Sequence, residues 1–165
     1  MRTLHLGARA FIPVALAAAV LFSVAPATPA AATTATEAQQ IVRIARAQLG
    51  DRWHYGATGP RSFDCSGLVV YAFRKAGDAR AIHTGFLRSA RSIYHWFKAH
   101  GKASRTNPRV GDLVVWGGGT HIGIYIGRGK AISTLRNGVH IHGVHAVSAR
   151  FTAYLHTGMS TKPAR

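Results

Sequence analysis

The chain has 165 residues and is strongly basic, with 21 lysines and arginines against five acidic residues and a formal net charge of +16. Its one cysteine excludes a scaffold of intramolecular disulfides, and its hydrophobic fraction of 47% is enough for an ordinary buried core. A surface of this charge predicts a polyanionic partner.

Residues 1–32 have the pattern of a secretory signal peptide. Basic residues precede an apolar run over residues 11–24, and small residues near Ala27 and Ala32 fit a cleavage site. The run is shorter than the ~20 residues that a spanning helix needs, and no later stretch approaches that length, so no transmembrane segment is expected. We expect a secreted protein whose residues 33–165 form one monomeric domain.

The charge of this predicted domain bears on the class of partner. Removal of Arg2 and Arg9 with the signal peptide leaves a net charge of +14, and the remaining basic residues are scattered rather than gathered on one predicted helix. Export favours anionic cell-wall polymers or phospholipid headgroups as partners, and because the basic residues are scattered, no nucleic-acid partner is expected. In the plainer interpretation, part of the charge serves solubility alone.

The first half of the predicted domain has helical periodicity. A capping-box pattern over residues 36–39 begins an amphipathic helix that we expect to end at Gly50. After a loop over residues 52–62, a second helix over residues 64–76 is apolar nearly all round, so we expect it to be buried. A third helical face ends at Gly101 and has the apolar positions Phe86, Leu87, Ala90, Ile93, Tyr94 and Phe97.

From about residue 110 the period changes to the alternation typical of strands. We expect an antiparallel meander of five strands over residues 113–116, 121–126, 131–135, 139–144 and 151–156. In the second of these strands, three alternating isoleucines point to the core and His121 points to the other face. Gly123 lies on the face of His121, and it predicts open space beside the imidazole and hence a cleft.

Cys65 lies where a thiol is expected to be reactive. Asp64 can cap the second helix, so the free N–H groups and the positive end of the helix dipole would lie beside the sulfur and lower the thiol pKa. A lone cysteine of this kind is a candidate nucleophile, and His121 is its candidate base. A buried structural thiol is the alternative interpretation.

Three motifs in this order resemble the catalytic domain of the NlpC/p60 cysteine peptidases: FDCSGLV at 63–69, GDLVVW at 111–116 and HIGIYIG at 121–127. The resemblance implies a papain-like α+β fold, with N-terminal helices packed on an antiparallel sheet. It also implies a secreted enzyme that cleaves peptidoglycan stem peptides through a thioester on Cys65, with His121 as base. In the family the usual bond lies between D-glutamate and the diamino acid, and no cofactor or metal is implied.

The same resemblance assigns roles to residues beside the nucleophile. In the family, the aspartate before the cysteine and the small residue after it help to hold the substrate's free amino group, and these positions are Asp64 and Ser66. The backbone N–H of Cys65 is expected to contribute to an oxyanion hole. Where the family often has a tyrosine in a PYxWGG-like segment, this chain has Trp53 followed by Tyr55, so both are candidate substrate contacts.

The residue that orients the base departs from the family pattern. Members commonly carry a histidine twelve positions after the base, where this chain has Ser133. His142, on the next predicted strand, is the rival orienter, and the sequence does not decide between them. In the plainer interpretation, His140, His142 and His145 are ordinary surface histidines. A zinc site built on His140 and His142 lacks a third ligand at any recognised spacing.

The sequence thus predicts a secreted cysteine-type hydrolase of cell-wall peptides. An amidase or acyltransferase that uses the same Cys65 and His121 pair is the second hypothesis. A non-catalytic cationic wall-binding protein is the third, and a Cys65→Ala variant separates it from an enzyme.

Overall fold

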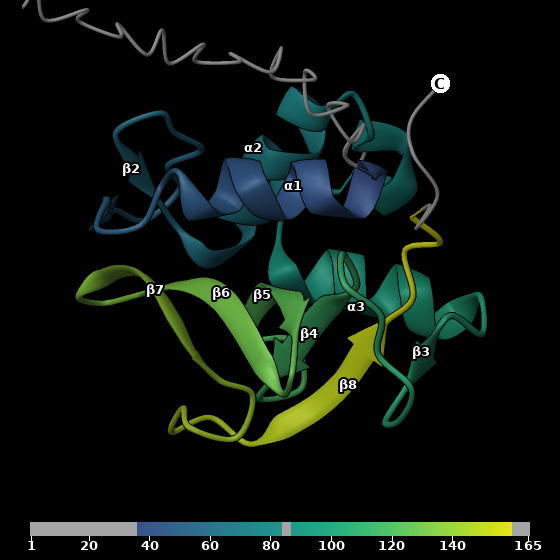
Figure 1. Ribbon diagram of the computed structural model, residues 1–165. Helices are drawn as coiled ribbons and strands as arrows, with labels where there is room; N and C mark the ends of the chain where they lie inside the picture. Colours follow the sequence, from purple (N-terminus) through teal and green to yellow (C-terminus); the bar gives the residue numbers. More distant parts are fainter. Residues whose placement is uncertain (1–35, 84–86, 160–165) are drawn as a thin grey trace, which may run out of the picture. The chain divides into compact units, whose positions relative to one another are not determined.

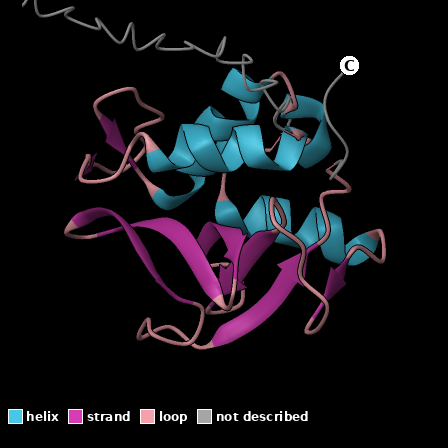
Figure 2. Cartoon of the chain, in the orientation of Figure 1, coloured by secondary structure: helices cyan, strands magenta, loops and turns pink. Residues whose placement is uncertain are grey.

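The computed structural model describes residues 36–83 and 87–159, and the predicted signal peptide lies outside these residues. The described residues form an α+β domain in which three α-helices lie against a six-stranded antiparallel sheet (Figures 1 and 2). No helix within these two ranges has the length and apolarity needed to cross a membrane.

The helices are α1 (Glu37–Arg46), α2 (Cys65–Ala76) and α3 (Ala90–Ala99), with a 3₁₀ turn η1 (Ala79–Ile82). The strands are β1 (Arg52–Trp53), β2 (Ser62–Phe63), β3 (Ala103–Ser104), β4 (Leu113–Trp116), β5 (His121–Gly127), β6 (Lys130–Leu135), β7 (Gly138–Gly143) and β8 (Phe151–Leu155). Strands β1 and β2 form a separate two-residue parallel pair.

Helix α1 begins as predicted and ends early. Thr36 and Gln39 form the predicted capping box. The helix ends at Arg46 rather than at Gly50, because the amide of Gly50 donates to the carbonyl of Val139 in β7 at 3.0 Å. After Arg46 the N–H groups of Gln48 and Leu49 donate to carbonyls three residues back, so the predicted last helical turn is a tighter turn that ends at the strand contact of Gly50.

The ends of α2 and α3 are set by side-chain caps. Asp64 caps α2 by accepting the N–H of Gly67 at 2.6 Å, and the left-handed Gly77 ends the helix as predicted. Helix α3 begins later than its apolar pattern predicted, because the hydroxyl of Ser89 accepts the N–H of Ser92 at 3.1 Å and starts the helix there. Phe86, at the start of that pattern, lies outside the described residues.

The sheet has the strand order β3-β8-β4-β5-β6-β7 (Figure 1). The predicted meander is correct from β4 to β7 and wrong for the last strand, since β8 pairs with β4 rather than with β7. Every residue of β4 is buried, and backbone groups in such a strand need partners along both edges. Strand β3, which the sequence pattern does not indicate, extends the sheet beyond β8.

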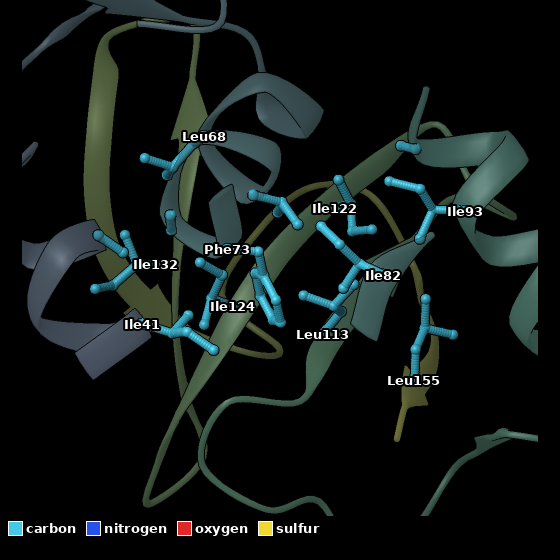
Figure 3. Close-up of a cluster of buried hydrophobic side chains, with 14 of the residues drawn as sticks. Ile41, Leu68, Phe73, Ile82, Ile93, Leu113, Ile122, Ile124, Ile132 and Leu155 are labelled. Carbon is cyan, nitrogen blue, oxygen red and sulfur yellow. The ribbon is translucent and has the colours of Figure 1, made fainter. Parts of the chain in front are cut away.

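The main core lies between the helices and one face of the sheet (Figure 3). Ile41 of α1, Phe73 of α2 and Leu155 of β8 have no exposed surface in this cluster. Ile122 and Ile124 of β5 are also fully buried here, as predicted. This packing holds α2, and with it the cysteine, against β5.

The opposite face of the sheet carries a second apolar cluster, formed by Val114, Trp116, Tyr125, Ala131, Val144 and Tyr154. The indole N–H of Trp116 donates to the carbonyl of Val144 at 2.6 Å. The ring centroid of Trp116 lies 5.2 Å from that of His121 and 5.5 Å from that of His142. His121 and His142 therefore pack against the Trp116 side of this second apolar cluster.

A buried carboxylate joins the edge of the sheet to the loop before β4. Asp112 is 3% exposed and accepts the N–H groups of Arg109 at 2.9 Å and Thr157 at 3.0 Å. It also meets Nδ1 of His156 at 2.9 Å, and Nε2 of that ring lies 2.8 Å from Ser104 Oγ. The Ser104 hydroxyl donates its proton to the carbonyl of Thr106 at 2.7 Å, so it is not activated by His156 as a nucleophile would be. The network holds these segments together and has no catalytic arrangement.

Candidate active site

A cleft of about 580 Å³ contains the N-terminal end of α2 and the start of β5. Six of the eight predicted site residues line it: Trp53, Tyr55, Asp64, Cys65, Ser66 and His121. The other two lie behind His121: Ser133 hydrogen-bonds His121, and His142 hydrogen-bonds Ser133. The structure thus brings all eight predicted residues into one region.

Cys65 is the first residue of α2, and its side chain is half-buried at the wall of the cleft. Burial raises the pKa of the Cys65 thiol, and the neighbouring Asp64 carboxylate raises it further. Backbone hydrogen bonds from Ile122 and Ser66 act in the opposite direction but do not outweigh burial. The prediction of a lowered thiol pKa is therefore wrong for the free protein, because the helix end does not compensate for the desolvation of a charged sulfur.

His121 is the first residue of β5 and immediately precedes Ile122, whose backbone bonds to the cysteine sulfur. Burial, with a smaller contribution from the nearby His142, lowers the pKa of His121 to about 4. At neutral pH the resting pair is consequently a neutral thiol and a neutral imidazole, rather than a thiolate with an imidazolium.

A series of hydrogen bonds determines which nitrogen of His121 keeps a free lone pair. Ser133 Oγ lies 2.9 Å from His121 Nε2 and 2.7 Å from His142 Nε2. His142 Nδ1 lies 3.0 Å from the carbonyl oxygen of Gly143. We call this series the Ser133–His142 relay. The two rival orienters of the sequence are therefore arranged in series.

The carbonyl at the end of the relay sets its direction. A carbonyl only accepts hydrogen bonds, so in a neutral His142 the proton resides on Nδ1 and Nε2 accepts from the Ser133 hydroxyl. The Ser133 oxygen must then accept from Nε2–H of His121. This arrangement leaves Nδ1 of His121 with a free lone pair, which is the form that a general base requires.

Gly123 serves the relay rather than opening the cleft. A Cβ at this position would lie 2.6 Å from the carbonyl oxygen of Ile132 and 2.8 Å from the Cβ of Ser133. The prediction of empty space beside the imidazole is therefore wrong, because the neighbouring strand β6 fills that space. Glycine here lets Ser133 approach closely enough to bond His121.

Arg88, which no sequence pattern identifies, organises the residues on either side of Cys65. Its guanidinium donates to the two carboxylate oxygens of Asp64 at 2.6 and 3.1 Å and to Ser66 Oγ at 2.6 Å. Burial alone would raise the pKa of Asp64, but the hydrogen bonds from Arg88 and Gly67 reverse the effect and lower it. Asp64 is thus an ionised carboxylate at neutral pH and is already satisfied by protein donors.

Two aromatic residues form the outer part of the cleft. Tyr55 is 82% exposed, so its ring is available to a ligand. Trp53 is half-buried, and the guanidinium of Arg136 lies 5.2 Å from its ring centroid.

The zinc alternative conflicts with the hydrogen bonds of its proposed ligands. His142 uses Nε2 toward Ser133 and Nδ1 toward Gly143, while Nε2 of His140 contacts the carbonyl of Asn137 at 3.0 Å. Within the described ranges, no group of three or more histidine, cysteine or acidic side chains is arranged to hold a metal.

Comparison with known proteins identifies relatives along this part of the chain. A protein of Corynebacterium glutamicum named “Probable endopeptidase Cgl2188” is 35% identical over 126 residues, which cover 76% of this chain and 54% of that protein. “Probable endopeptidase p60” of Listeria monocytogenes is 32% identical over 108 residues, covering 64% of this chain and 20% of that protein. The chain therefore spans about half the length of the first relative and a fifth of the second.

Solved structures support the same assignment of the fold. The peptidoglycan hydrolase RipB of Mycobacterium tuberculosis matches with a TM-score of 0.59 at 24% identity, over 75% of this chain and 65% of that one. NlpC1 of Trichomonas vaginalis matches with a TM-score of 0.61 at 22% identity, over 74% of this chain and 45% of that one. The sequence profile of the NlpC/P60 family matches residues 50–157, a range that includes the cysteine, the histidine and the relay. The chain belongs to the NlpC/P60 family.

Proposed function

We propose that this chain is a secreted cysteine endopeptidase that hydrolyses an amide bond in peptidoglycan stem peptides, between D-glutamate and the diamino acid. The observation that carries the proposal is a thiol and an oriented imidazole in one cleft, where Nε2 of His121 is committed to Ser133 and Nδ1 is left as the base. The names of the relatives, endopeptidases and a peptidoglycan hydrolase, support the class of substrate. The sequence pattern of residues 1–32 supports export.

The reaction begins from the neutral pair. As the sulfur of Cys65 attacks the substrate carbonyl carbon, Nδ1 of His121 takes the thiol proton, so that the charged sulfur need not form in advance in a site that disfavours it. The carbonyl oxygen becomes an oxyanion, which the backbone N–H of Cys65 stabilises. His121 then returns the proton to the leaving amine, and a thioester remains on Cys65.

Water completes the cycle. His121 removes a proton from a water molecule that attacks the thioester carbonyl, and the carboxylic acid leaves as the thiol is restored. Ser133 and His142 are positioning residues in this scheme, because they hold the ring and its tautomer without touching the substrate. Asp64 and Ser66, braced by Arg88, and the aromatic residues Trp53 and Tyr55 bind the substrate chain beside the reacting bond.

Digestion of purified muropeptides of known structure tests the proposal. The parent protein and a Cys65→Ala variant are incubated with the same substrates, and the fragments are identified by mass spectrometry. We expect cleavage after D-glutamate by the parent and none by the variant. Cysteine-dependent release at another amide would indicate an amidase or acyltransferase, whereas binding without release by the parent would indicate a wall-binding protein.

A further inference from the structure

The cleft is more basic than the proposed chemistry requires. Three arginines line it, Arg88, Arg91 and Arg136, and Asp64 is its one acidic residue. Within the described ranges, Asp64 pairs with Arg88 at 2.6 Å, and no carboxylate of these ranges forms an ion pair with Arg91 or Arg136. Arg91 and Arg136 therefore bring to the cleft two positive charges that no carboxylate of the described residues neutralises.

Arg136 is held in position by an aromatic ring. It directly follows β6, and its guanidinium lies 5.2 Å from the ring centroid of Trp53, which also lines the cleft. A guanidinium stacked in this way keeps its N–H donors free for a planar anion. Its side chain is exposed, so a ligand reaches it without displacing protein contacts.

Arg91 occupies a position that the helix itself disfavours. It is the second residue of α3, where the positive end of the helix dipole opposes a cation, and no acidic residue lies in that first turn. Its backbone packs against the turn that leads into β5, since a Cβ on Gly119 would come within 3.1 Å of the Arg91 Cα. The Arg91 Cα is thus held beside the turn that leads into β5, and its exposed side chain, which lines the cleft, has no carboxylate partner among the described residues.

We propose that Arg91 and Arg136 form a carboxylate-binding pair that makes the enzyme prefer stem peptides with free carboxylates over their amidated forms. The inference rests on the proposed function and adds a determinant of specificity to it. A D-glutamate linked through its side chain keeps a free α-carboxylate near the scissile bond, and this is the group that the pair would bind. Conversion of this carboxylate to a carboxamide keeps its shape but removes its charge, so both arginines lose a charge-assisted partner.

Two synthetic peptides test the proposal: L-Ala-γ-D-Glu-diaminopimelate and its analogue with the glutamate α-carboxylate amidated. We expect the parent to cleave the acid form with a kcat/KM about tenfold higher, a ratio that corresponds to about 1.4 kcal/mol. In Arg91→Gln or Arg136→Gln, the ratio should fall toward one, chiefly through a higher KM for the acid form. Arg46→Gln, which removes an exposed charge at the end of α1, is the control for net charge and should keep the ratio.

A binding measurement separates failure of this inference from failure of the proposed function. The Cys65→Ala protein is titrated with both peptides by calorimetry, with and without the Arg91→Gln or Arg136→Gln change. Tighter binding of the acid form that depends on either arginine supports the inference even if the parent cleaves neither peptide. Equal binding of the two forms, no binding of either, or a preference that survives both substitutions overturns it.

Discussion

Ser133 is the one side chain that joins the two histidines of the relay, and its replacement by alanine tests whether the relay works in series. The substitution removes the 2.9 Å contact to His121 and the 2.7 Å contact to His142 at a residue with no exposed surface. A net hydrogen bond contributes about 1 kcal/mol, and a buried polar nitrogen left unpaired costs ~1–3 kcal/mol. If that loss falls on the orientation of the base, kcat decreases roughly 5- to 100-fold.

His142→Ala should have a smaller effect, because Ser133 can still bond His121. What is lost is the acceptor that directs the Ser133 hydroxyl, so we expect roughly a two- to fivefold decrease in kcat, below the cost of one full hydrogen bond. The Ser133→Ala/His142→Ala double variant should match Ser133→Ala alone, since residues that act through one another are not additive. His140→Ala is the matched control, because His140 lies on the same strand but contacts the carbonyl of Asn137 instead of the relay.

The assay is steady-state cleavage of a soluble muropeptide, in which KM should stay nearly constant because the relay does not touch the substrate. Nitrogen NMR of labelled His121 supplies an independent readout, since the tautomer with the proton on Nε2 should dominate in the parent and decline in Ser133→Ala. A greater loss in His142→Ala than in Ser133→Ala would falsify the series arrangement. The series arrangement would also be refuted if the decrease in kcat of the double variant equalled the product of the decreases in the two single variants.

Three further outcomes follow from other parts of the structure. The folded protein holds the pKa of His121 near 4, while that of the unfolded chain is about 6.5, so the free energy of unfolding should decrease by at most ~3 kcal/mol as pH falls from about 6.5 to 4. Urea unfolding measured across this pH range should show a weaker pH dependence of that free energy in His121→Gln. An equal pH dependence in the parent and the variant would contradict the burial argument. Asp112→Ala leaves the donors of Arg109, Thr157 and His156 unpaired and should reduce the free energy of unfolding by ~2–4 kcal/mol, while activity at low temperature is retained because this network lies outside the cleft. Binding to intact walls should weaken as salt shortens the Debye length from about 8 Å at physiological ionic strength, whereas cleavage of a small peptide should change less; a parallel decline of both would show that the basic surface does not capture walls.

Local interactions account for the parts of the molecule that the sequence predicts well. The caps at Thr36 and Asp64 and the stop at Gly77 act within one helical turn, so their residue types are enough to place the start of α1 and both ends of α2. Isoleucines alternate with other residues along β5 because one face of the strand is buried, and this alternation correctly assigns Ile122 and Ile124 to the core. The motifs that resemble the NlpC/p60 family are also short segments, and they place Cys65 at the start of a helix and His121 at the start of a strand, as the structure has them.

Interactions between distant segments account for the rest. Arg88 reaches Asp64 across 24 positions, and the contacts of Ser133 with His121 and His142 require the registers of three strands at once, which no local pattern encodes. The pKa of the Cys65 thiol depends on how much protein covers the sulfur, a quantity that exists only once α2 is packed against β5. The amino-acid sequence by itself therefore determined the start of α1, both ends of α2, the core face of β5 and the place of Cys65 at a helix end, because these depend on hydrogen bonds and side-chain periodicity within short segments. Only the tertiary structure decided the direction in which burial shifts the pKa of Cys65 and the direction of the relay behind His121, because burial and strand register are properties of the packed chain.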